Sequence, residues 1–154
     1  MKHNHFPKEH TWIVIANAVE AQFYQVNGKL AELIKTLEHP DSRLKSKNLT
    51  SDKPGSYQTS HSARGHFVSA DVPHLDEQDH FSREINAELE TQRLHNSYQT
   101  LVLCAEPHFL GLLKKHMNNQ VRGLLKKTIE KDYIPLPKHK IDHIIQDIIH
   151  EDLI

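Results

Sequence analysis

The most constraining feature of the sequence is a nearly continuous apolar run from Thr11 to Ala16. The run is rich in β-branched residues, which is typical of a strand buried on both faces of a sheet. A second strand-like stretch covers Ala21 to Val26, and Asn27-Gly28 marks a turn directly after it. The spacing therefore predicts a central strand with a partner beside it, on which later helices pack.

The length and composition favour one globular domain over residues 1–154. The chain is 37% hydrophobic and 25% charged, with a net charge of -1, so its overall charge points to no class of partner. No stretch approaches the roughly 18 consecutive apolar residues of a membrane span. The N-terminus lacks the apolar core of a signal peptide, so a cytoplasmic location is expected. Cys104 is the only cysteine, which excludes an internal disulfide.

Hydrophobic spacing predicts the remaining elements. The expected strands are Leu33 to Leu37, antiparallel to the second, then Thr100 to Ala105, and a short one near Thr128 to Glu130 after a helical turn. The expected helices are Asp76 to Asn96, one whose first residue is Pro107, and Lys138 to Glu151. The segment from Asp41 to Val72 is rich in Ser, Lys, Asp and Gly, and predicts a long polar loop.

The resulting order is β-β-β-α-β-α-β-α. Strands that alternate with helices after an initial meander predict an α/β fold, with a five-stranded mixed sheet and helices on its faces. The predicted core contains Ile13, Ile15, Phe81, Ile85, Val102, Cys104, Ile141, Ile145 and Ile148.

Several stretches resemble the bacterial host attachment protein family. They are Thr11 to Ala18 with Ala21 to Tyr24, Ser51 to Gly55, the acidic helix carrying Phe81, Leu101 to Leu113, and Ile129-Glu130-Lys131-Asp132 leading to Pro137 and Ile141. Each motif is short, and their order and spacing carry the resemblance over nearly the whole chain.

That family is similar to the middle domain of archaeal and eukaryotic release factors and of Pelota, which implies an RNase H-like sandwich. In release factors the loop before the first helix carries a Gly-Gly-Gln tripeptide that enters the peptidyl-transferase centre. The corresponding loop here contains Gly55-Ser56-Tyr57-Gln58. Paired glycines permit positive φ and close backbone approach, which Ser56 and Tyr57 would obstruct. The resemblance therefore implies a release-factor-like fold without peptidyl-tRNA hydrolysis.

Neither metal binding nor nucleophilic catalysis is favoured by the side chains available. The chain has 14 histidines, but its close pairs, His3/His5, His61/His66 and His139/His143, supply only two of the three or four ligands that zinc needs. Ser60, His61 and Ser62 are adjacent in sequence, which is not the geometry of a catalytic triad. Cys104 lies in an apolar strand and is expected to pack there. We therefore expect no catalytic residues and no metal or cofactor.

A nuclease is a less favoured alternative. Asp76, Glu77 and Asp79 form a cluster of carboxylates that could hold Mg²⁺ in an RNase H-like fold. The same residues also suit a solvated first helical turn, where the helix dipole favours negative charge. The chain has neither a Gly-x-Gly-x-x-Gly motif nor a Walker sequence.

The local charge pattern is more informative. Residues 41–66 hold five Lys and Arg against two acids, residues 106–131 hold six against two, and residues 75–93 hold six acids against two arginines. If the two basic segments share a face, they form a patch that contacts phosphates; otherwise they are an ordinary solvated surface. The candidate nucleic-acid or partner-binding residues are Lys45, Lys47, Lys53, Gly55, Tyr57, Gln58, Arg64, Lys114, Lys115 and Arg122.

Two functions therefore stand ahead of an unrecognised hydrolase or nuclease. The first is a non-enzymatic factor that associates with the ribosome or RNA. The second is a host-interaction factor that acts through a protein partner.

Overall fold

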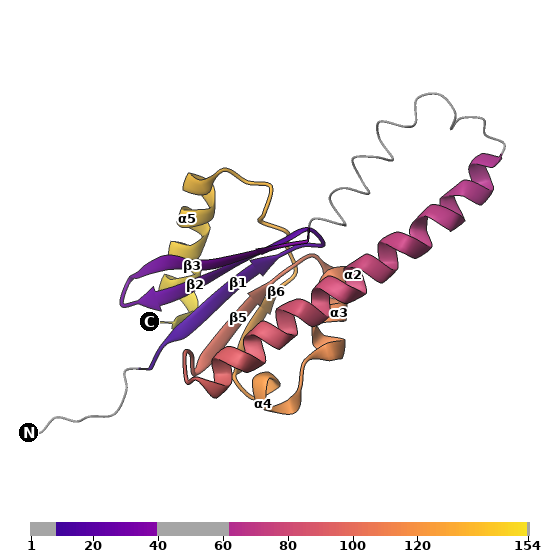
Figure 1. Cartoon of the computed structure of the whole chain (residues 1–154). Coiled ribbons are helices and arrows are strands. Elements are labelled where there is room, and N and C mark those ends of the chain that lie inside the picture. Colours follow the sequence, from indigo (N-terminus) through magenta and orange to yellow (C-terminus); the bar gives the residue numbers. More distant parts are fainter. Residues whose placement is uncertain (1–8, 40–61, 154) are drawn as a thin grey trace, which may run out of the picture.

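The computed structural model describes the backbone of residues 9–39 and 62–153, and the side chains of residues 9–39 and 75–153. Five strands form one mixed sheet in the order β3-β2-β1-β5-β6 (Figure 1). Their bounds are β1 Thr11–Ala16, β2 Glu20–Asn27, β3 Leu30–Glu38, β5 Thr100–Cys104 and β6 Leu125–Ile129. The central strand is β1, as predicted. It pairs antiparallel with β2 and parallel with β5, while β3 and β6 form the two edges.

Helices cover both faces of the sheet (Figure 1). Their bounds are α2 Ser62–Leu94, α3 Pro107–His116, α4 Asn119–Arg122 and α5 Lys138–Ile148, and α5 continues into a π-helical turn, η1 Ile149–Leu153. This confirms an α/β fold with a five-stranded mixed sheet flanked by helices.

The alternation of side chains along β1 explains its continuous apolar run. Trp12 and Val14 point to the face covered by α2 and α3, whereas Ile13 and Ile15 point to the face covered by α5. Both sets are almost fully buried, so neither face of β1 can tolerate polar residues. Every residue of the predicted core is buried.

The start of α2 corrects the sequence prediction. The helix begins at Ser62 rather than Asp76, so residues 62–72 are helical where an irregular loop was expected. The prediction rested on the stripe of Phe81 and Ile85, which exists only where α2 packs on the sheet. Upstream of that contact, α2 extends beyond the edge of the sheet and no such stripe is needed (Figure 1). Residues 41–61 of the predicted loop lie outside the described part of the chain.

The acidic cluster is also placed differently from the prediction. Asp76, Glu77 and Asp79 lie in the middle of α2, and the first turn of that helix contains no acidic residue. The helix dipole therefore does not account for them.

Several other boundaries differ by a few residues. Strand β3 begins at Leu30 rather than at the predicted Leu33. The predicted helical turn is α4, but β6 begins at Leu125 rather than near Thr128. Charged residues are common on edge strands, and the exposed Lys126 and Lys127 mask the apolar alternation there. The last helix leaves α-helical geometry after Ile148, and its π-helical turn extends past the predicted end at Glu151.

Candidate functional site

Polar side chains follow three neighbouring parallel strands at one edge of the sheet. Asn17 comes directly after β1, Glu106 follows β5, and Asp132 follows β6. The carboxyl ends of parallel strands meet at one edge, where α/β proteins commonly bind their ligands. A functional site is therefore expected at this edge.

Asn17 and Asp132 lie against each other. The Asn17 Nδ2 donates to Asp132 Oδ2 at 3.1 Å, while its Oδ1 accepts from the backbone N–H groups of Val19 and Glu20, both at 3.0 Å. Asp132 Oδ1 also accepts from the N–H of Ile134 at 3.0 Å. The pair joins the β1–β2 turn to the segment after β6 and fixes the backbone on both sides.

The sequence did not predict the contact between these two residues. An Asn–Asp contact across the chain has none of the features of a charged patch, a histidine pair or a nucleophile. A signal was present nonetheless: Asn17 and Asp132 each lie in a stretch that carries the family resemblance.

Glu106 is used by the helix that follows it. Its two carboxylate oxygens accept from the backbone N–H groups of His108 and Phe109, at 2.9 and 2.8 Å. These are two of the N–H groups that a helix start leaves unpaired, and Pro107 has none to satisfy. The predicted helix start at Pro107 is confirmed, with Glu106 as its cap.

His39 ties the end of β3 to α2 at the same edge. Its backbone N–H donates to Val19 O, and its Nε2 lies 2.6 Å from Glu77 Oε1. His39 is 7% exposed, and the centre of its ring lies 5.3 Å from that of Phe81. Glu77 of the acidic cluster therefore contacts a histidine of the sheet, and the chain leaves this edge after His39 into residues 40–61.

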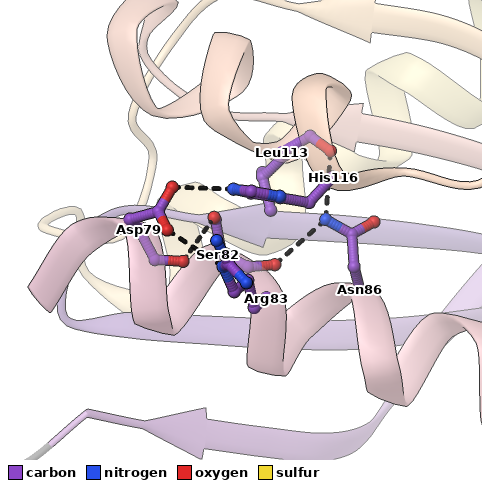
Figure 2. Close-up of polar contacts among 6 residues, drawn as sticks. All are labelled: Asp79, Ser82, Arg83, Asn86, Leu113 and His116. Carbon is purple, nitrogen blue, oxygen red and sulfur yellow. Dashed lines mark hydrogen bonds and ion pairs between the residues drawn. The ribbon is translucent and has the colours of Figure 1, made fainter. Parts of the chain in front are cut away.

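Asp79 makes a second contact between histidine and carboxylate, on α3. His116 Nε2 lies 2.7 Å from one oxygen of Asp79, and Arg83 Nε donates to the other at 2.9 Å (Figure 2). Hydrogen bonding to His116 is the main cause that lowers the pKa of Asp79, with Arg83 adding to it. Glu77 and Asp79 therefore bind different neighbours and are not arranged as a pair around one site.

A buried amide completes the junction of α2 and α3. Asn86 Nδ2 donates to the carbonyl oxygens of Ser82 and Leu113, both at 3.0 Å (Figure 2). The hydroxyl of Ser82 is fully buried and donates to Asp79 O at 2.8 Å. Its proton is thus directed to the backbone of its own helix. Serine, histidine and aspartate are close here, yet their hydrogen bonds hold two helices together and do not form a triad.

The described side chains contain no group of three or more His, Cys, Asp or Glu arranged to hold a metal ion. Cys104 is fully buried in β5 and packs in the core, as predicted.

Of the predicted binding residues, the side chains of three are described: Lys114, Lys115 and Arg122. Lys115 and Arg122 are exposed, and Lys114 is half-buried. Arg122 Nη2 donates to Lys114 O at 2.6 Å and lies 3.4 Å from Met117 O. The guanidinium thus caps the carbonyl end of α3, where positive charge is favourable. The three residues lie where α3 meets α4, and we call them the basic corner.

The basic corner lies towards the amino ends of the parallel strands. Leu124, two residues after Arg122, accepts a hydrogen bond from the N–H of Leu101 near the start of β5. Residues 40–61 instead begin beyond His39, at the carboxyl edge. Lys45, Lys47, Lys53, Gly55, Tyr57 and Gln58 lie outside the described residues, and Arg64 lies in α2 with its side chain outside them. A shared face for the two basic segments remains a prediction.

Among the helices described, none combines the length and apolar character that crossing a membrane requires.

Comparison with known proteins identifies the family. The model of a family described as "Protein required for attachment to host cells" matches residues 12–145, which is most of the chain. A search of curated proteins finds no match. The matched region includes both Asn17 and Asp132, and extends from the central strand into α5. The chain therefore belongs to the family of proteins required for attachment to host cells.

Proposed function

We propose that this host attachment protein is a non-enzymatic binding factor that associates with the ribosome or RNA through its basic residues. The observation that carries the proposal is which polar groups already have partners within the described part of the protein. Asn17, Glu106 and Asp132 at the carboxyl edge are engaged with one another or with the backbone. Lys114 and Lys115, by contrast, make no ion pair with any described side chain.

The fold supports the same proposal. A mixed five-stranded sheet with helices on both faces is what the resemblance to release factors implies, and the segment between β3 and α2 is where those proteins carry their Gly-Gly-Gln tripeptide. Here that segment contains Gly55 and Gln58 without a glycine pair. The proposal is therefore a cytoplasmic, RNase H-like domain that binds without cleaving peptidyl-tRNA.

Sedimentation with ribosomes tests this proposal. The native protein should co-sediment at low salt and dissociate as salt rises, because each phosphate contact releases counterions. Lys114→Glu/Lys115→Glu should weaken the association. Lys138→Glu/Lys140→Glu on α5 makes the same change of charge on the other face of the sheet and should leave it intact. Failure of the native protein to bind ribosomes or RNA at any salt would reject the proposal, and release of peptide from peptidyl-tRNA would reject its non-enzymatic part.

A second candidate function is attachment to a host through a protein partner. The family description favours it directly. Under this alternative, deleting the protein reduces adhesion to host cells while ribosome sedimentation shows no salt-sensitive binding. Cell fractionation separates a direct role from an indirect one, because a protein confined to the cytoplasm cannot contact the host itself.

A further inference from the structure

The outer edge of the sheet at β3 is exposed along most of its length. Among the described strands, β3 pairs only with β2. Leu30, Leu33 and Ile34 are 67%, 41% and 40% exposed, which is unusual for large apolar side chains grouped on one strand. An exposed edge strand presents unpaired backbone groups and is a ready template for another strand. Pairing with another strand would cover the apolar side chains on this edge, and the sequence of β3 indicates which strand fits.

A β-bulge at the centre of β3 changes the alternation of its side chains. Tyr24 pairs with Leu33 and Phe23 pairs with Lys35, so Ile34 is the extra residue. Without a bulge, Glu32 and Lys35 would point to opposite faces. With it, they share the face covered by α2.

Contacts on both sides of the sheet confirm this placement. Lys35 Nζ lies 3.1 Å from Glu88 on α2. Glu32 pairs with Gln25, whose side chain accepts from Trp12 on that same face. On the other face, Ala31 packs in the cluster around α5. Thr36 is opposite Gln22, which accepts a hydrogen bond from the Tyr24 hydroxyl, so it faces α5 as well.

The bulge thereby makes β3 symmetric about its own centre. If a second β3 lies antiparallel with Leu33 opposite Ile34, the residues that face each other on either side of this pair come from the same face of the sheet. Glu32 of each copy then lies opposite Lys35 of the other, and Ala31 opposite Thr36. Leu30 meets Leu37, and Lys29 in the turn meets Glu38. Opposite charges and apolar pairs in these positions each stabilise an antiparallel ladder.

Other registers lack this match. Sliding the copies by two residues in one direction sets Leu33 opposite Glu32, from different faces of the sheet. Sliding them in the other direction sets Glu32 opposite Leu37 and Lys35 opposite Ile34, so the charged pairs are lost. A strand shifted out of phase exposes the residues that should be covered. Charge and face pattern therefore agree on one register.

We propose that β3 is a homodimer interface, at which two copies of this chain pair antiparallel and join their sheets into one continuous sheet of ten strands. The arrangement has a two-fold axis, so every contact occurs twice. The inference concerns assembly and goes beyond the proposed binding function.

Charge reversal provides a sharp test in the full chain. Sedimentation velocity across the micromolar range should show a dimer for the native protein. Glu32→Lys should raise the dimer dissociation constant by about tenfold or more, because symmetry places two like-charge contacts in the interface. Lys35→Glu should do the same. Glu130→Lys makes the same change of charge beyond β6, at the other edge of the sheet, and should leave the dimer unchanged.

Mixing the two variants distinguishes pairing from a general loss of structure. A Glu32→Lys copy presents two lysines and a Lys35→Glu copy presents two glutamates, so a mixture should form a heterodimer although neither variant dimerises alone. Lys35→Glu also faces Glu88 within its own chain, and Glu88→Gln in the same copy removes that repulsion if the single variant is unstable.

Three results would overturn the proposal. They are a native protein that stays monomeric across this range, a dimer that Glu32→Lys leaves intact, and variants that remain monomeric when mixed while the native protein dimerises.

Discussion

Asn86 is a buried polar residue, and the hydrogen bonds of its amide offset the cost of burying it. It is 8% exposed and supplies hydrogen to two carbonyl oxygens, one on its own helix α2 and one at Leu113 on α3. A buried carbonyl oxygen without a hydrogen-bond donor costs free energy, so the Asn86 amide stabilises the junction of α2 and α3.

Replacing this amide should therefore destabilise the protein measurably. We expect Asn86→Ala to lower the free energy of unfolding by about 1–3 kcal/mol, because Leu113 O loses its donor. Thr91→Ala, on the exposed side of the same helix, should change it little. Urea unfolding followed by circular dichroism measures both, and equal effects of the two substitutions would contradict a specific role for Asn86.

Glu90 should give the protein a distinct response to acid. Arg93 donates two hydrogen bonds to its carboxylate, at 2.8 and 2.9 Å, and with Asn118 holds the pKa of Glu90 at about 2, well below its ordinary value of 4.5. A depressed pKa contributes stability above the ordinary value and loses it as the pH falls through the folded value. The effect is small because the carboxylate is open to solvent.

Thermal melts at several pH values test this expectation. The difference in Tm between the native protein and Glu90→Gln should be largest above about pH 4.5 and shrink towards pH 2. Glu130→Gln, exposed and distant from this pair, should show no such trend. A difference that does not change with pH would mean that Glu90 acts through packing rather than charge.

At the scale of the elements, the Asn17–Asp132 contact joins two connections that are far apart in sequence. Because the carboxylate is charged, we expect a coupling free energy of about 1.5–3 kcal/mol between Asn17→Ala and Asp132→Ala in a double-mutant cycle. Additive effects of the two substitutions would show that the Asn17 turn and the segment after β6 are stabilised independently.

The isoleucines of α5 distinguish buried from half-buried positions on one helix. Ile145 is 2% exposed and packs against Ile13 and Ile15 of the central strand, whereas Ile144 is half-buried beside it. Ile145→Ala should cost about 2–5 kcal/mol in the free energy of unfolding. Ile144→Ala should lower the free energy of unfolding clearly less in the same urea titration. A larger loss for Ile144→Ala than for Ile145→Ala would contradict the orientation of α5 on the sheet.

Elements with a strong apolar pattern could be predicted from the sequence, and those without one could not. Spacing predicted β1, the stripe of α2 and the buried face of α5, because each packs against the sheet along its length. It missed the start of α2 at Ser62, where the helix leaves the sheet, and the start of β6, where an edge position accepts Lys126 and Lys127.

The candidate site likewise has features that the sequence could predict and contacts that it could not. Basic residues are visible in a sequence, and Lys114, Lys115 and Arg122 fall where α3 meets α4, whereas their binding role stays a prediction. The contacts of Asn17 with Asp132 and of His39 with Glu77 depend on which strand ends meet, and β-strand order is a property of long-range pairing. Neither contact could be derived from local spacing.

At the scale of the whole molecule, the proposed association with ribosomes or RNA makes a prediction about the segment between β3 and α2. Charge reversal of Lys45, Lys47 and Lys53 together should abolish salt-sensitive association, because clustered lysines bind phosphates. Tm should stay within about a degree of the native value if these side chains lie on the surface. A large fall in Tm would show that the lysines stabilise the fold, and unchanged association would assign binding to the basic corner alone.

The buried position of Cys104 has a practical consequence for labelling experiments. Burial raises the pKa of its thiol to about 12, so almost no thiolate is present at neutral pH, and the thiolate is the form that attacks maleimides and other thiol reagents. The folded chain thus behaves towards such reagents as if it had no cysteine. A fluorophore can be attached to a new surface cysteine without first replacing Cys104, and slow modification of Cys104 itself then reports each opening of the central sheet.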